Sequence, residues 1–203
     1  MWHWLRQLFS SGPAATRSAE RGPAASPLPL DESRRPLLLN QLYVQPDDGE
    51  DFDKEACERL IATISTAGSH SVDDANVFVT LEDFFVGNRC KHSIAANVVT
   101  PAPYDTAQSW FELLKQIRAT SGIHGVTIEI IMIEPYADGR VGMWPYADTI
   151  WIHSSLDQAA VAALVAPLEP DEVCDASDDE FDRGPQPPFP ATVQARPYRI
   201  WWD

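Results

Sequence analysis

VTIEIIMI, residues 126–133, and TIWIH, residues 149–153, are the two stretches on which the fold of this chain depends. Both are short and rich in β-branched and apolar side chains, which is typical of buried β-strands. The connection between them, residues 134–145, contains Pro, Asp and Gly, which are turn-forming residues. We therefore expect the two strands to pair in an antiparallel manner.

The hydrophobic periodicity predicts further elements on both sides of this pair. The predicted helices cover residues 51–67, 106–120 and 156–165, the last capped by Ser154 or Ser155, and the other predicted strands cover 76–81, 171–174 and 198–202. From residue 76 the order is strand, helix, strand, strand, helix, strand, which is the split βαβ pattern. We predict an α+β fold with a ferredoxin-like sheet (βαββαβ) and an extra N-terminal helix over 51–67.

The N-terminal part differs in composition from the rest. Residues 11–36 consist mainly of Ser, Ala, Pro and Gly, and such a segment cannot bury enough apolar surface to order itself. Before it, Trp2, Leu5 and Phe9 lie at helical spacing. We expect residues 1–36 to form a disordered tail and linker with a short amphipathic start, and residues 37–203 to form a single acidic α+β domain.

Charge separates the predicted tail from the predicted domain. The 203 residues carry a formal net charge of -15, but residues 1–40 carry about +2, so the domain holds nearly all of the negative charge. A surface of this kind repels nucleic-acid phosphates and anionic lipids and favours a basic protein partner. The alternative is that the acidity only supports solubility.

The cysteine count and the lack of long apolar runs indicate the cellular compartment and the kinds of bound group to expect. Three cysteines at wide spacing, Cys57, Cys90 and Cys174, indicate neither a disulfide framework nor a structural zinc site. No run is long enough to span a membrane, and the N-terminus lacks the apolar core of a secretory signal. We therefore expect a cytoplasmic protein with no metal. Glycine-rich phosphate-binding motifs are missing as well, so we also expect no cofactor.

Two acidic runs, residues 47–58 and 169–182, are the candidate binding faces. Each is either a solvated loop or a docking surface for a basic protein. Trp144 and Tyr146 are candidate interface aromatics, since Trp and Tyr are common interface anchors, although large aromatic residues also build cores. The carboxylates assigned to the two binding faces are Asp47, Asp48, Glu50, Asp51, Asp175, Asp178, Asp179 and Glu180.

Catalytic candidates are few. Cys90 and His92 lie two residues apart and could form a nucleophile and base or bind a metal, but no third group supports them. Glu82 and Asp83 follow a predicted strand and either perform acid–base chemistry or cap a turn. We therefore name no catalytic residue.

Five segments carry a resemblance to a known group of proteins: LEDFFVGN (81–88), SIAAN (93–97), WPYADTIWI (144–152), PDEV (170–173) and the terminal WWD (201–203). With these segments the chain resembles a family of small, acidic, uncharacterised bacterial proteins. By type it is similar to cytoplasmic immunity proteins, which neutralise toxins. The resemblance implies a toxin as partner, which the acidic charge predicts to be basic, and it supplies no catalytic residue.

Two functions follow as hypotheses. The first is a non-enzymatic protein-binding domain, of the immunity type, that neutralises a basic toxin through its acidic surface. The second is a small, hydrolase-like enzyme that uses Glu82, Asp83, His92 or His124 in a cleft beside the sheet.

Overall fold

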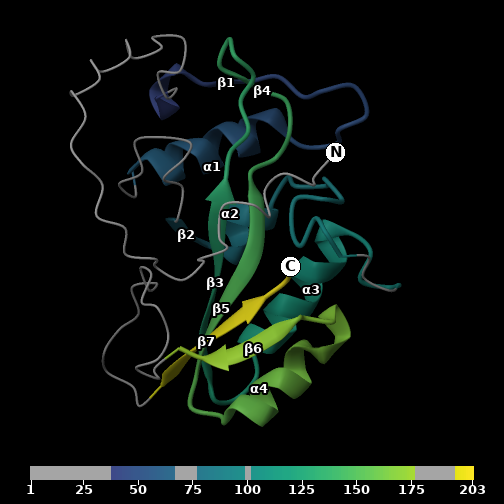
Figure 1. Ribbon diagram of the computed structural model, residues 1–203, viewed down its shortest axis with the longest axis vertical. Helices are drawn as coiled ribbons and strands as arrows, with labels where there is room; N and C mark the ends of the chain where they lie inside the picture. Colours follow the sequence, from purple (N-terminus) through teal and green to yellow (C-terminus); the bar gives the residue numbers. More distant parts are fainter. Residues whose placement is uncertain (1–37, 67–76, 99–101, 177–194) are drawn as a thin grey trace, which may run out of the picture. The chain divides into compact units, whose positions relative to one another are not determined.

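The structure is a computed structural model that describes residues 38–66, 77–98, 102–176 and 195–203, all of which belong to one compact unit, residues 35–203. The predicted tail, residues 1–36, lies outside the described residues. The fold is α+β, as predicted, with a five-stranded sheet in the order β2-β3-β5-β7-β6 (Figure 1). Its strands are β2 (Val77–Thr80), β3 (Ile123–Met132), β5 (Tyr146–Ser154), β7 (Arg196–Trp201) and β6 (Glu172–Asp175).

The central hairpin confirms the first prediction. β3 and β5 are antiparallel neighbours in which Ile128 lies opposite Ile150, and both side chains are fully buried. Directly opposed residues project from the same face of a sheet. The isoleucines of the two quoted stretches therefore meet in the core.

The ferredoxin-like topology is not confirmed, because β2 and β3 are direct antiparallel neighbours, whereas a split βαβ unit would make them parallel with another strand between them. In a βαβ unit one helix carries the chain back to the start of the next, parallel strand. Here two helices separate β2 from β3, namely α2 (Leu81–Phe85) and α3 (Ala107–Arg118). The additional segment returns the chain to the end where β2 stopped, so Thr80 lies opposite Thr127 in antiparallel register. The short α2 was not predicted.

The predicted long helices are confirmed, with shifted ends. They are α1 (Lys54–Thr66), α3 and α4 (Gln158–Val165). Asp157 caps α4 by accepting a hydrogen bond from the Ala160 N–H at 2.8 Å, so the predicted serine cap is wrong. Asp accepts from the free amides of a first turn as well as Ser does.

The core lies between the sheet and the helices α2, α3 and α4, which cover one face (Figure 1). From α3, Trp110 and Leu114 are buried in it, and from α4, Val161 and Val165. Trp202, just beyond β7, packs on Trp110 with ring centroids 5.0 Å apart. The C-terminal end of the chain is thus part of the core.

A second, two-stranded sheet lies beside α1. β1 (Tyr43–Val44) pairs in parallel with β4 (Arg140–Val141), so the predicted turn over 134–145 contains a short strand. A 3-10 helix, η3 (Leu39–Gln41), precedes β1, and another, η5 (Ala166–Leu168), follows α4. None of the helices in these described ranges is long and apolar enough to cross a membrane.

Candidate functional site

Three carboxylates of the second acidic run and the terminal Asp203 form an exposed group at the β6 edge of the sheet. Antiparallel pairing of β6 with β7 places Glu172 opposite Trp201. The Asp203 N–H donates to the Asp171 carboxylate at 2.8 Å, which fixes the end of the chain beside the start of β6. We call the four exposed residues Glu169, Asp171, Glu172 and Asp203 the acidic patch.

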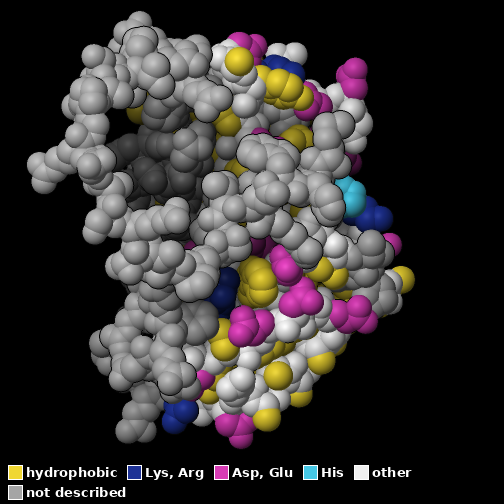
Figure 2. Space-filling view, viewed as in Figure 1, with side chains coloured by type: hydrophobic (Ala, Val, Ile, Leu, Met, Phe, Trp, Pro, Cys, Tyr) yellow, Lys and Arg dark blue, Asp and Glu magenta, His cyan; other side chains and the backbone are white. Residues whose placement is uncertain are grey.

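The acidic patch is not neutralised within the described residues, where none of its four side chains forms an ion pair. Figure 2 shows acidic side chains gathered near β6 and the C-terminus on the face in view. Neighbouring carboxylates repel one another unless a cation or a basic side chain comes between them. A basic partner would relieve this repulsion.

The first acidic run is different, because the chain itself neutralises much of it. Asp47 accepts hydrogen bonds from the Tyr136 hydroxyl and the Arg140 guanidinium, which lower the pKa of Asp47. Asp51 pairs with Arg89 at 2.8 Å. Asp48 remains exposed. These contacts hold Asp47 beside β4 and Asp51 beside the segment that follows α2, so both carboxylates have a structural role.

The remaining predicted binding residues fall into three situations. Glu50 is half-buried beside the Cys90 thiol, whose pKa it helps to raise. Asp175 pairs with Arg196 at 3.0 Å across the β6–β7 ladder. Asp178, Asp179 and Glu180 lie outside the described residues.

Trp144 belongs to the core, which was the alternative to an interface role. Its side chain is 1% exposed and meets the Phe52 ring edge-on at 5.7 Å. Tyr146 is half-buried, its hydroxyl lies 3.2 Å from the Met143 sulfur, and burial raises its pKa to about 12. Neither residue offers the freely exposed ring that an interface anchor needs.

The two carboxylates considered for acid–base chemistry, Glu82 and Asp83, have structural partners. Glu82 forms a two-pronged ion pair with Arg118, at 2.9 and 2.5 Å, that joins α2 to α3. Asp83 is part of a capping box with Thr80 at the start of α2. Asp83 therefore caps α2, as the capping alternative held, whereas Glu82 links α2 to α3.

The Cys90–His92 pair has no reactive thiol. Cys90 is buried, and burial raises its pKa to about 12, so the nucleophilic thiolate is not formed near neutral pH. His92 is exposed and lines a small hollow of about 100 Å³ with Lys91 and Trp110. All three cysteines are free thiols. Within the described ranges, no three His, Cys, Asp or Glu residues come together as metal ligands.

A second group of carboxyls lies on the sheet face opposite the core isoleucines. Glu129 of β3 accepts a hydrogen bond from the Trp151 indole at 2.7 Å. Burial is the main cause that raises the pKa of Glu129, and Asp148 raises it further, whereas Trp151 and Arg199 lower it. The pKa of Asp148 is also raised, again chiefly by burial. We call Glu129, Asp148 and Arg199 the carboxyl pair and its arginine.

Carboxyl groups with raised pKa values keep a proton to higher pH than ordinary carboxyls do, which makes this pair a candidate acid–base site. Sequence reasoning did not select either residue. The signal was present for Glu129, which is the single charged residue in VTIEIIMI. Asp148 lies where the β3–β5 register shifts between Thr149 and Ala147, a bulge that only the structure reveals.

Comparison with known proteins places the chain in a family. The pattern of the family described as "Uncharacterized protein YfbO family" matches residues 55–197. The chain is 24% identical over 148 residues to "Uncharacterized protein YfbO" of Escherichia coli (strain K12), an alignment that covers 72% of this chain and 97% of that protein. No solved structure matches the chain significantly. Since the family pattern covers well over half of the sequence, the chain belongs to the Uncharacterized protein YfbO family.

Proposed function

We propose that this chain is a non-enzymatic protein-binding domain that presents the acidic patch to a basic protein. The observation that carries the proposal is the convergence of Glu169, Asp171, Glu172 and Asp203, exposed and without ion pairs among the described residues. Charge complementarity of this kind speeds association and selects the partner. The same charge opposes binding to nucleic acid.

Neutralisation of a basic toxin, in the manner of an immunity protein, is the setting we propose for this binding. Such a role needs a surface rather than a catalytic centre, and the acidic patch supplies one. We place the protein in the cytoplasm, because free thiols suit a reducing compartment.

The test compares two charge-neutralised variants of the full chain. The patch variant carries Glu169→Gln, Asp171→Asn, Glu172→Gln and Asp203→Asn, and the control carries Asp48→Asn, Glu55→Gln, Asp105→Asn and Glu112→Gln, all at exposed positions. Partners cross-linked to the wild type in the native cell are identified by mass spectrometry, and the purified pair is then measured at low and high salt. We expect the patch variant to bind a basic partner roughly tenfold or more weakly, and salt to slow wild-type association.

A partner that the patch variant binds as tightly as the wild type does, at any ionic strength, would remove the proposal. The control variant guards against a general effect of net charge, because both variants lose the same number of carboxylates.

A second candidate function, a small hydrolase-like enzyme, is favoured by the carboxyl pair on the sheet. Glu129 and Asp148 replace the residues expected from the sequence, since Glu82 and Asp83 are engaged in α2. The purified chain would be assayed against ester, amide and glycoside substrates. If it is such an enzyme, Glu129→Gln should lower kcat by roughly a hundredfold without unfolding the protein. Activity unchanged by this substitution, or none in the wild type, would exclude this site.

A further inference from the structure

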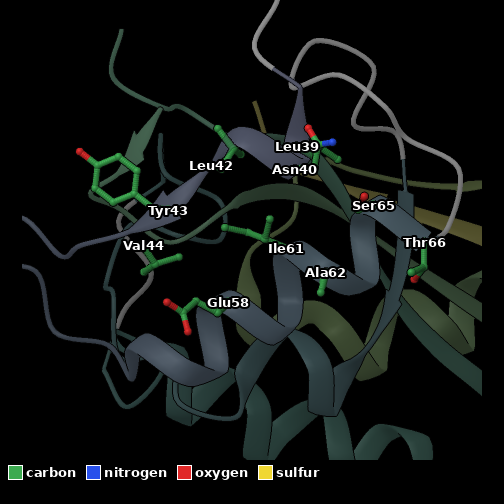
Figure 3. Close-up of a pocket in the computed structure, with 10 residues that line it drawn as sticks. All are labelled: Leu39, Asn40, Leu42, Tyr43, Val44, Glu58, Ile61, Ala62, Ser65 and Thr66. Carbon is green, nitrogen blue, oxygen red and sulfur yellow. The ribbon is translucent and has the colours of Figure 1, made fainter. Parts of the chain in front are cut away.

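The described part of the chain contains an apolar groove. It lies near β2, at the opposite edge of the five-stranded sheet from β6 and the acidic patch. α1 forms one wall and the segment from η3 to β1 forms the other, and the hollow between them has a volume of about 420 Å³ (Figure 3). Ile61 points from α1 into this space, and Leu42 and Val44 border it from the opposite wall. A smaller hollow of about 220 Å³ shares Leu39 with it and extends to Leu38.

Exposed apolar side chains continue the groove at its margins. Leu38 is 45% exposed at one end, and Tyr43 is 46% exposed at the other. Isolated apolar residues on a surface are ordinary, but a hollow lined by several of them marks a binding site. The groove is therefore suited to apolar side chains.

One edge of β1 borders this groove, and its backbone N–H and C=O groups are not paired with another strand among the described residues. The amides of Tyr43 and Gln45 donate to the carbonyls of Gly139 and Val141, each at 3.0 Å. Because successive amides of a strand point to opposite edges, the N–H and C=O of Val44 face away from β4. Within the described residues β1 has no other strand neighbour. An extended backbone placed along this edge would find a donor and an acceptor.

Charge further restricts the occupant. Glu58 is the one charged residue among those that line the larger hollow, and its side chain is 47% exposed. Its partner Lys54 lies 3.6 Å away and is 58% exposed, and such a pair on a helix surface is weak. A Lys or Arg side chain of a ligand would be attracted to this position, as it would be to a chain of net charge -15.

We propose that the groove binds an extended, apolar segment of a partner protein, which adds to β1 as a strand and directs a Lys or Arg side chain to Glu58. The segment is short: Glu58 to Thr66 spans about 12 Å of helix, which about four extended residues would match. This surface is separate from the acidic patch, so the inference goes beyond the proposed function, and either can fail alone.

The test uses the full chain and a displayed library of random linear peptides as the probe. We expect selected peptides to alternate apolar residues and to carry Lys or Arg. Calorimetry with a synthetic copy of a selected peptide should show at least tenfold weaker binding to the Ala62→Arg variant, whose new side chain fills the groove from an exposed position. The matched control variant, Ala163→Arg on α4, should bind the peptide as the wild type does. Glu58→Gln should weaken binding roughly threefold, whereas Glu112→Gln, also in a helix-surface pair, should not.

Amide hydrogen exchange provides the readout for strand addition, because the Val44 N–H should become protected when the peptide binds. Several outcomes would overturn the inference: no peptide is selected, Ala62→Arg binds as well as the wild type, or the Val44 amide stays unprotected. Self-association of the wild type that Ala62→Arg abolishes would assign the groove to a second copy and also overturn it. The patch variant should keep peptide binding, and Ala62→Arg should keep the basic partner, which separates this inference from the proposed function.

Discussion

At the level of single residues, Gly87 determines how α1 approaches the end of α2. Its φ of +86° is in the left-handed region, and a Cβ there would lie 2.5 Å from the Ala56 Cβ. The Gly87 carbonyl accepts the Asp53 N–H at 2.8 Å, so the two segments also share a hydrogen bond. Only glycine meets both requirements.

We predict that Gly87→Ala lowers the free energy of unfolding by about 2–4 kcal/mol, because backbone strain and a steric clash act together. Gly49→Ala is the matched control: Gly49 has a φ of +92°, but no atom lies within 4 Å of the position that a Cβ would occupy there. It should cost about 1 kcal/mol from strain alone. Denaturant unfolding measures both, and equal losses would contradict the steric part.

His153 provides a prediction about pH. Burial, with a smaller contribution from His124, lowers its pKa from 6.5 to about 4. Between these values the unfolded chain binds more protons than the folded one, so stability falls as the pH decreases through this window. From pH 7 to pH 5, the wild type should lose roughly 1–2 kcal/mol that His153→Gln does not lose.

Chemical denaturation at the two pH values measures this difference. His92→Gln, at an exposed position, is the control and should follow the wild type. Parallel losses in the wild type and His153→Gln would show that His153 remains able to protonate in the folded state.

At the level of the secondary-structure element, α2 depends on its cap. It has only five residues, too few to be stable alone, and the Thr80 hydroxyl accepts the Asp83 N–H at 3.1 Å while the Asp83 carboxylate turns back to Thr80. This cap places Phe84 and Phe85 in the core. The segment LEDFF therefore has a structural role, as a short capped helix.

We predict that Thr80→Ala destabilises the protein by about 1 kcal/mol, the usual cost of a lost N-cap. Thr80→Ser retains the hydroxyl and should lose less than half of that amount. Thermal and denaturant unfolding of both variants would test this, and a serine variant as unstable as the alanine variant would show that the Thr80 methyl group, not the cap, matters.

At the level of the complete fold, the C-terminal residues join the sheet to the helices. Trp202 is 1% exposed, packs on Trp110 of α3 and donates from its indole to the Leu168 carbonyl at 2.9 Å. Trp201 points to the other face of the sheet, opposite Thr149 and Glu172. Two adjacent tryptophans therefore have different roles.

We predict that Trp202→Ala lowers the free energy of unfolding by about 3–5 kcal/mol, as expected for a large aromatic residue removed from a core. Trp201→Ala, which is only partly buried, should cost roughly half as much or less. The comparison by denaturant unfolding is internally controlled, since the same side chain is removed one position apart. Equal costs would contradict the difference in packing.

Hydrophobic periodicity was enough to specify the long helices and the strands of the five-stranded sheet, because these features depend on local patterns of buried side chains. The turn residues of 134–145 added the antiparallel pairing of 126–133 with 149–153. The topology came from tertiary contacts, since a five-residue helix has too little periodicity to be recognised and yet reverses the chain. The candidate sites also depend on tertiary contacts. Asp47 and Asp51 are neutralised by arginines distant in sequence, and Asp171 meets Asp203 only when β6 pairs with β7. Charge is visible in a sequence, but which charges remain unpaired depends on contacts between residues far apart in the chain.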